Sequence, residues 1–185
     1  MSSDKITTFK FLEKFMKEYK VIYLASGRAK LKNKYVTYND LYEPADLNCD
    51  MLDVDLTSYD VILASPPCNY YSKARGSLPP SKYAENTKHL LPEILSKCIN
   101  LGKPFIVENV RNKPLFLKLG YFDFPCFVYF YGRHTYWTNI MINFSNIPQS
   151  FDFSYGGKKL KAYIQGGENV NSIFEYFLEV VCNRV

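Results

Sequence analysis

A cysteine follows two prolines at the end of a strongly apolar segment, in the stretch DVILASPPCNYYSKA (residues 60–74). Proline fixes φ and removes an amide donor, so Pro66 and Pro67 must turn the chain out of a sheet here. The thiol of Cys68 would then face a cleft at the end of a strand. Cysteine is also a common small core residue, and the sequence leaves both roles open.

A carboxylic acid ends a second apolar segment about forty residues later. The stretch PFIVENV places Glu108 and Asn109 near its end. A single strand-end acid is more often a surface or capping residue. In a parallel sheet, however, Glu108 and Cys68 would face the same crevice at the carboxyl ends of their strands. A thiolate with a carboxyl proton donor is suited to nucleophilic catalysis.

Alternating apolar runs and helical patterns must position these residues. Strands are expected in residues 20–27, 34–40, 59–65 and 103–110, with one or two more in residues 126–139. Helices are expected in residues 9–19, 81–101 and 169–185, the second with a kink or restart at Pro92. This alternation predicts an α/β fold with a mainly parallel sheet.

Composition limits the class of protein. The 185 residues predict a single domain, and 47% hydrophobic with 22% charged residues is typical of a globular chain. The net charge of +5 permits a polyanionic partner without requiring one. Five cysteines without CxxC spacing and only two histidines do not form a zinc pattern, and they favour reduced, intracellular thiols. We expect no signal peptide and no membrane span.

Three motifs, in this order and spacing, resemble the DNA (cytosine-5)-methyltransferases, especially the short forms found in bacterial viruses. SPPCNYYSKA resembles the family's nucleophile motif, VENV its glutamate motif, and Arg133 in GRHTYWTN stands at the first arginine of its Arg-x-Arg pair. The resemblance covers roughly residues 20–140, with a fainter echo in IQGGENVNSI. It implies a Rossmann-like methyltransferase fold with a mainly parallel sheet and helices on both faces.

The resemblance also implies a mechanism. Cys68 would attack C6 of a cytosine, while Glu108, at least partly protonated, would hydrogen-bond or protonate N3. Arg133 would bind the base carbonyl or a phosphate, and Asn109 would hold the loop. The cytosine must be flipped or single-stranded to reach such a site. Three residues after the nucleophile would contact the substrate: Ser72, Lys73 and Arg75.

The cofactor motif departs from the family's Leu-Phe-Ser-Gly-x-Gly-Gly. The chain has LASGRAK at residues 24–30, which keeps Gly27 but replaces the phenylalanine with Ala25 and two glycines with Ala29 and Lys30. Glycines in such turns let a ligand approach the backbone, so these changes should narrow or reshape the S-adenosylmethionine site. The second arginine of the Arg-x-Arg pair is replaced by Thr135.

Other residues resemble the remaining parts of that cofactor site. Asp40 stands where a ribose-binding acid belongs, and Asp50 or Asp53 could meet the adenine, although all three are equally read as ordinary loop acids. Pro66 and Asn169 complete the expected cofactor-binding set.

The chain is short for a methyltransferase that reads a DNA sequence. We expect one methyltransferase-like catalytic domain over residues 1–185, because residues 139–170 hold at most a reduced target-recognition domain. The stretch SYGGKKLKAY (residues 154–163) is either a small phosphate-binding and stacking element or an exposed hairpin. A protein partner could therefore supply sequence recognition. The expected location is the cytoplasm, or the interior of a host cell for a viral protein.

Three functions remain open from the sequence. The first is C5 methyl transfer to DNA cytosine. The second is cytosine C5 modification with another one-carbon donor or on a free cytosine nucleotide, which the positive charge of Lys30 favours. The third is a catalytically silent relative that binds nucleic acid or modulates a methyltransferase partner. Retention of Cys68 and Glu108 argues against the third.

Overall fold

The structure of this chain is a computed structural model that describes residues 18–29, 31, 35–73, 78–143 and 159–184. The helix expected over residues 9–19 lies almost entirely outside the described residues. Within them, no helix has both the length and the apolar composition needed to cross a membrane.

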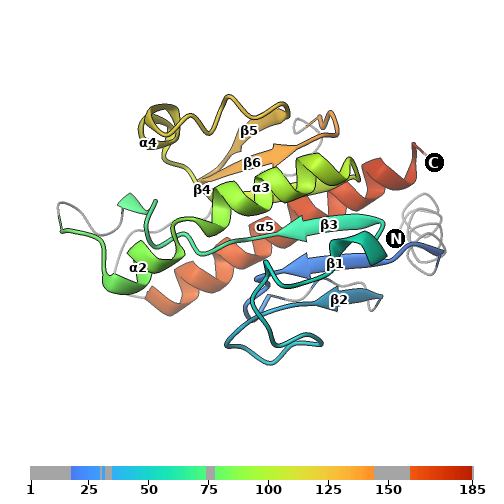
Figure 1. Ribbon diagram of the computed structural model, residues 1–185, viewed down its shortest axis with the longest axis horizontal. Coiled ribbons are helices and arrows are strands. Elements are labelled where there is room, and N and C mark those ends of the chain that lie inside the picture. Colours follow the sequence, from blue (N-terminus) through green and yellow to red (C-terminus); the bar gives the residue numbers. More distant parts are fainter. Residues whose placement is uncertain (1–17, 30, 32–34, 74–77, 144–158, 185) are drawn as a thin grey trace.

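Six strands form one sheet in the order β2-β1-β3-β4-β6-β5 (Figure 1). Their bounds are β1 Val21–Leu24, β2 Val36–Tyr38, β3 Val61–Ala64, β4 Phe105–Val110, β5 Phe127–Tyr131 and β6 His134–Thr138. The pairs β1/β2, β1/β3 and β3/β4 are parallel, whereas β4/β6 and β5/β6 are antiparallel. The sheet is therefore mixed, because β6 runs against the other five strands.

The reversal of β6 has a local cause. Only Gly132 and Arg133 separate β5 from β6, and such a short turn can join only antiparallel strands. Gly132 has a φ of 57°, which glycine adopts without strain. The turn fixes the register and brings His134 opposite Val110 at the end of β4.

The helices differ from the predicted ones in their bounds. They are α2 Lys82–Thr87, α3 Leu90–Leu101, α4 Lys113–Lys118 and α5 Lys159–Cys182, with a 3-10 turn at Leu56–Ser58. The helix predicted over residues 81–101 is divided between α2 and α3. The break precedes Pro92, which lies in the first turn of α3, where its missing amide costs no helical hydrogen bond. The helix α4 was not predicted from the sequence. Residues 159–163, predicted to belong to a small phosphate-binding and stacking element or to an exposed hairpin, instead form the start of α5.

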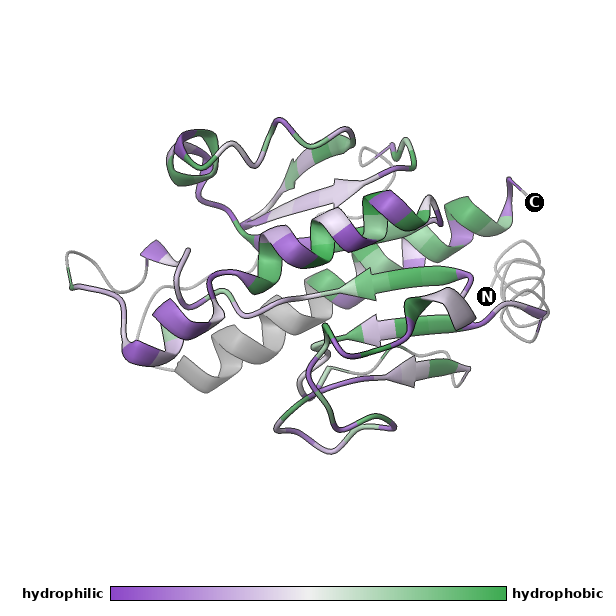
Figure 2. Cartoon of the chain, in the orientation of Figure 1, coloured by the Kyte–Doolittle hydropathy of each residue, from purple (hydrophilic) through white to green (hydrophobic). Residues whose placement is uncertain are grey.

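Helices cover both faces of the sheet, as expected. On one face Ile22, Ile62 and Val107 pack in a core with Leu91 and Ile94 of α3. On the other face, alternate residues of the same strands meet the α5 side chains Ile173, Phe174 and Phe177. Figure 1 shows α3 in front of the sheet and α5 behind it, and Figure 2 shows hydrophobic colour along the whole of β3 and over part of β1.

Candidate active site around Cys68

Cys68 lies in a tight turn just beyond β3. Its carbonyl oxygen accepts hydrogen bonds from the amides of Tyr71 at 3.0 Å and Ser72 at 2.9 Å. Tyr71 is fully buried, contacts the ring of Phe116 and donates its hydroxyl to the carbonyl of Lys88. The turn is thus anchored by a core tyrosine, while Cys68 itself stays half-buried.

Two buried asparagines from the end of β4 hold this turn on either side of Cys68. Asn109 donates from Nδ2 to the carbonyl of Pro66 at 2.9 Å, and Asn112 donates to the carbonyl of Tyr71 at 2.7 Å. Asn109 is 0% exposed and Asn112 is 9% exposed. Asn109 therefore makes the loop contact that the resemblance implies. The clamp by Asn112 was not anticipated, because asparagine after a strand is an ordinary turn residue.

The side chain of Glu108 meets His134 of β6. Glu108 pairs with Tyr136 across the β4/β6 ladder, and His134, two residues before Tyr136, lies on the same face. Glu108 Oε1 and His134 Nδ1 are 2.5 Å apart. The two side chains are only 10% and 17% exposed, respectively. From the sequence, His134 was considered only as a zinc ligand. The proximity of His134 to Glu108 could not be seen there, because it depends on the antiparallel register of β6.

Burial and charge act together on the thiol of Cys68. Burial raises its pKa, and the negative charge of Glu108 raises it further, to about 11. The thiol and the acid are therefore within electrostatic reach of one another. At neutral pH Cys68 carries its proton, so a reaction through its sulfur must also remove that proton.

The predicted arginine site is arranged differently. Arg133 is exposed in the turn between β5 and β6, where its carbonyl accepts a hydrogen bond from the Arg111 amide at 2.6 Å. Thr135 is fully buried and, by strand alternation, faces away from Glu108. In this segment His134, between these two residues, contacts the acid.

The predicted substrate-binding residues lie just beyond the Cys68 turn. Ser72 is half-buried and Lys73 is exposed, whereas Arg75 lies outside the described residues. Lys73 is thus accessible close to the nucleophile. Pro66, predicted to bind the cofactor, is buried at the base of the turn.

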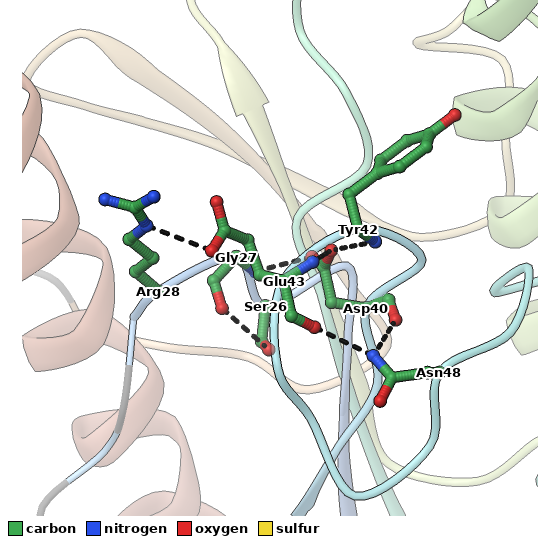
Figure 3. Close-up of polar contacts among 7 residues, drawn as sticks. All are labelled: Ser26, Gly27, Arg28, Asp40, Tyr42, Glu43 and Asn48. Atoms are coloured by element: carbon green, nitrogen blue, oxygen red, sulfur yellow. Dashed lines mark hydrogen bonds and ion pairs between the residues drawn. The ribbon is translucent and has the colours of Figure 1, made fainter.

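The carboxyl ends of β1 and β2 form the expected cofactor region, where Asp40 closes the loop (Figure 3). Asp40 Oδ2 accepts a hydrogen bond from the Gly27 amide at 2.8 Å, and Oδ1 accepts from the amides of Tyr42 and Glu43 at 2.9 Å each. Gly27 has a φ of 56°, and Ala25 has a φ of 49°, which is rare for alanine. A surface ion pair between Arg28 and Glu43, 3.0 Å apart, spans the same loops.

These contacts use most of the hydrogen-bonding capacity that Asp40 would need for the role in ribose binding that the resemblance implies. A carboxylate has about four acceptor positions, and three of those of Asp40 are occupied by backbone amides. Asp50 is likewise engaged, because it accepts the Leu52 amide at 2.9 Å, while Asp53 is exposed. Lys30 lies outside the described residues, and Asn169 falls within α5, where only the backbone is described.

Comparison of the chain with known protein families, with curated proteins and with solved structures finds no match. The site must therefore be interpreted from its own geometry.

That geometry brings three groups capable of proton transfer or nucleophilic attack to one end of the sheet. A protonated thiol, a buried carboxyl group and an imidazole come from the loop after β3, from β4 and from β6. Among the residues that the structure describes, no group of three or more histidine, cysteine, aspartate or glutamate side chains is arranged to hold a metal ion. The arrangement is suited to a thiol nucleophile assisted by proton transfer.

Proposed function

We propose that this protein modifies C5 of cytosine in DNA through a covalent bond between Cys68 and C6 of the base, with methyl transfer as the first candidate reaction. The observation that carries the proposal is the 2.9 Å hydrogen bond from Asn109 to the Pro66 carbonyl. This bond ties the end of β4 to the loop after β3. It thereby supports a site in which the thiol and Glu108 act on the same base.

The chemistry explains why both groups are needed. Cytosine C5 is a weak nucleophile, but addition of sulfur to C6 with protonation of N3 produces an enamine that is nucleophilic at C5. Glu108 serves as the acid at N3, and Cys68 forms the covalent bond. After transfer, loss of the C5 proton allows the C6–S bond to break and Cys68 to leave.

The fold is part of the same proposal. We assign a Rossmann-like methyltransferase fold of one domain, which is supported by five strands of common direction and by helices on both faces. Ligands bind beyond the carboxyl ends of parallel strands in such sheets, and Cys68 follows that end of β3. The acid and the thiol come from the neighbouring strands β4 and β3.

The proposed substrate is a flipped or single-stranded cytosine, since the reacting carbon cannot be reached within a stacked duplex. The net charge of +5 and the exposed Lys73 support a phosphate-bearing substrate. A partner protein would supply sequence recognition, because α5 takes residues 159–170 of the region 139–170, which was expected to hold a reduced recognition domain. Such a protein would act in the cytoplasm or inside an infected cell.

A second candidate differs in the donor. The resemblance implies S-adenosylmethionine, but the three backbone hydrogen bonds of Asp40 favour another one-carbon donor or a free cytosine nucleotide as substrate. Calorimetric titration with S-adenosylmethionine separates the two. Micromolar binding supports methyl transfer from this donor, and absence of binding supports the second candidate.

Covalent trapping tests the proposed function directly. With S-adenosylmethionine present as donor, DNA that contains 5-fluorocytosine should form a stable complex with the protein, because after methyl transfer C5 carries fluorine and no proton that the final elimination could remove. Cys68→Ser should abolish trapping. Cys126→Ser is a matched control, because burial also raises the pKa of Cys126 to about 11. Cys126 directly precedes β5, so it lies at the amino end of its strand, whereas Cys68 follows the carboxyl end of β3. Trapping that persists in Cys68→Ser, or is absent from the unaltered protein, contradicts the proposal.

A further inference from the structure

The carboxyl group of Glu108 has a titratable hydrogen-bond partner that the proposed chemistry does not yet use. Its 2.5 Å contact with His134 Nδ1 is the one side-chain hydrogen bond that Glu108 makes within the described residues. Both side chains are largely buried on the sheet face that α5 covers. Two such groups in hydrogen-bond contact can pass a proton directly from one to the other.

Other titratable groups surround the pair. Tyr136 of β6 lies 6.2 Å from the His134 ring, between centroids, and Tyr131 of β5 pairs with His134 in the sheet. Burial raises the pKa of both phenols, so they stay neutral near physiological pH. Tyr23 of β1 lies on the same face, and the charged neighbours of the adjoining turn are Arg111 and Arg133. From α5, this core receives the apolar side chains Ile173, Phe174 and Phe177, together with the titratable Cys182 and Tyr176.

The loop after β3 supplies the remaining titratable group, the thiol of Cys68. The charge of Glu108 acts on this thiol, so the thiol, the carboxyl group and the imidazole form a connected series. Cys68 has no hydrogen bond to His134 in the structure. Any influence of His134 on the sulfur therefore passes through Glu108.

We propose that Glu108 and His134 act as one proton-transfer pair, in which His134 orients Glu108 and exchanges a proton with it while Cys68 adds to the base. His134 is a positioning residue, since it acts through Glu108 and not on the substrate. This inference rests on the proposed function, and it gives a role to His134, whereas the resemblance implies one only for the neighbouring Arg133.

The proposed step balances without another reactant. The S–H bond of Cys68 breaks and its proton passes to the Glu108–His134 pair, while the sulfur forms a bond to C6. The C5=C6 electron pair forms a C4=C5 double bond, the N3=C4 electron pair moves onto N3, and N3 receives a proton from Glu108. The pair ends with the protons it had at the start, and the thiol proton is in effect transferred to N3. This transfer is needed because Cys68, with a pKa of about 11, is protonated near neutral pH.

The test is the rate of covalent trapping by 5-fluorocytosine DNA, measured from about pH 5 to about pH 9, the range in which histidine titrates. His134→Asn keeps an amide donor near Glu108 but cannot exchange a proton. We expect trapping at neutral pH to slow by about 10- to 100-fold, and the pH dependence to change shape. His89→Asn is the matched control, because His89 is the other histidine and is exposed at the start of α3.

A double-mutant comparison makes the result independent of small structural effects. If the two residues act as one unit, Glu108→Gln combined with His134→Asn should trap no more slowly than Glu108→Gln alone. His134→Gln provides a second variant if His134→Asn has a lowered unfolding midpoint. Losses that multiply, or a His134→Asn profile that matches the unaltered protein, overturn the inference and leave the proposed function standing. Absence of trapping in the unaltered protein overturns both.

Discussion

Two loop regions lie at the carboxyl ends of the parallel strands. In both, a buried asparagine holds the loop, but the acids of the two regions have different hydrogen-bond partners. At β1 and β2, the fully buried Asn39 donates to the carbonyls of Leu47 and Cys49, at 3.2 and 2.9 Å. At β3 and β4, Asn109 holds the Pro66 carbonyl in the same manner. Each region thus uses a buried side-chain amide to satisfy the carbonyl oxygens of a loop.

The acids of these regions have different partners. Asp40 is bound by three backbone amides, which cannot gain or lose a proton at ordinary pH. Glu108 is bound by an imidazole, which can. The first region therefore holds a loop conformation, and the second has a partner that is able to exchange a proton with the acid. This contrast predicts that isosteric changes at the two acids have opposite consequences.

Glu108→Gln should have the largest effect on the reaction. The amide keeps the shape of the side chain but cannot deliver a proton to N3, so covalent trapping should slow by about 100-fold or more. The midpoint of thermal unfolding should stay close to that of the unaltered protein. Glu93→Gln, an exposed change in α3, is the control and should alter neither measurement. An unchanged trapping rate in Glu108→Gln makes the acid structural.

Asp40→Asn should show the reverse. The amide replaces one carboxylate oxygen and removes the charge that the three backbone amides face, so the free energy of unfolding should fall by about 1–3 kcal/mol. The trapping rate per folded molecule should not change. Denaturation in urea measures the first quantity, with Asp53→Asn, an exposed loop acid, as the control. Unaltered stability together with weakened S-adenosylmethionine binding would instead assign Asp40 to a ligand.

The charge of Glu108 should also be measurable at the thiol. Burial is the main cause that raises the pKa of Cys68 to about 11, and Glu108 adds to it. In Glu108→Gln the pKa should fall, so the thiolate fraction at any pH below it should rise. Alkylation of Cys68 at about pH 8 should therefore become faster, by less than tenfold because one pKa unit is tenfold and most of the shift comes from burial. Slower or equal alkylation contradicts the electrostatic contact between the two residues.

The sequence predicted where the strands lie in the chain better than it predicted the contacts between them. The apolar runs around Ile22, Ile62 and Ile106 located β1, β3 and β4, because a buried strand needs a continuous apolar segment. The break between α2 and α3 was misplaced, because Pro92 fits a first helical turn as well as a kink. The contacts of His134, Asn112 and Asp40 could not be predicted, since each depends on register or loop closure across distant parts of the chain.

The smallest expected effect concerns the backbone of the turn after β1, where Ala25 and Gly27 both have positive φ. An L-residue at a φ of 49°, as at Ala25, costs about 1–2 kcal/mol, and glycine removes that cost but loses more entropy on folding. Ala25→Gly should therefore raise the free energy of unfolding by about 0.5 kcal/mol. Gly27→Ala should lower it by about 1 kcal/mol, through conformation alone, because among the described residues no atom beyond its two chain neighbours lies within 4 Å of the added Cβ. Urea denaturation of the two variants should thus give shifts of opposite sign, and shifts of the same sign would show that the turn is not held in this conformation by Asp40.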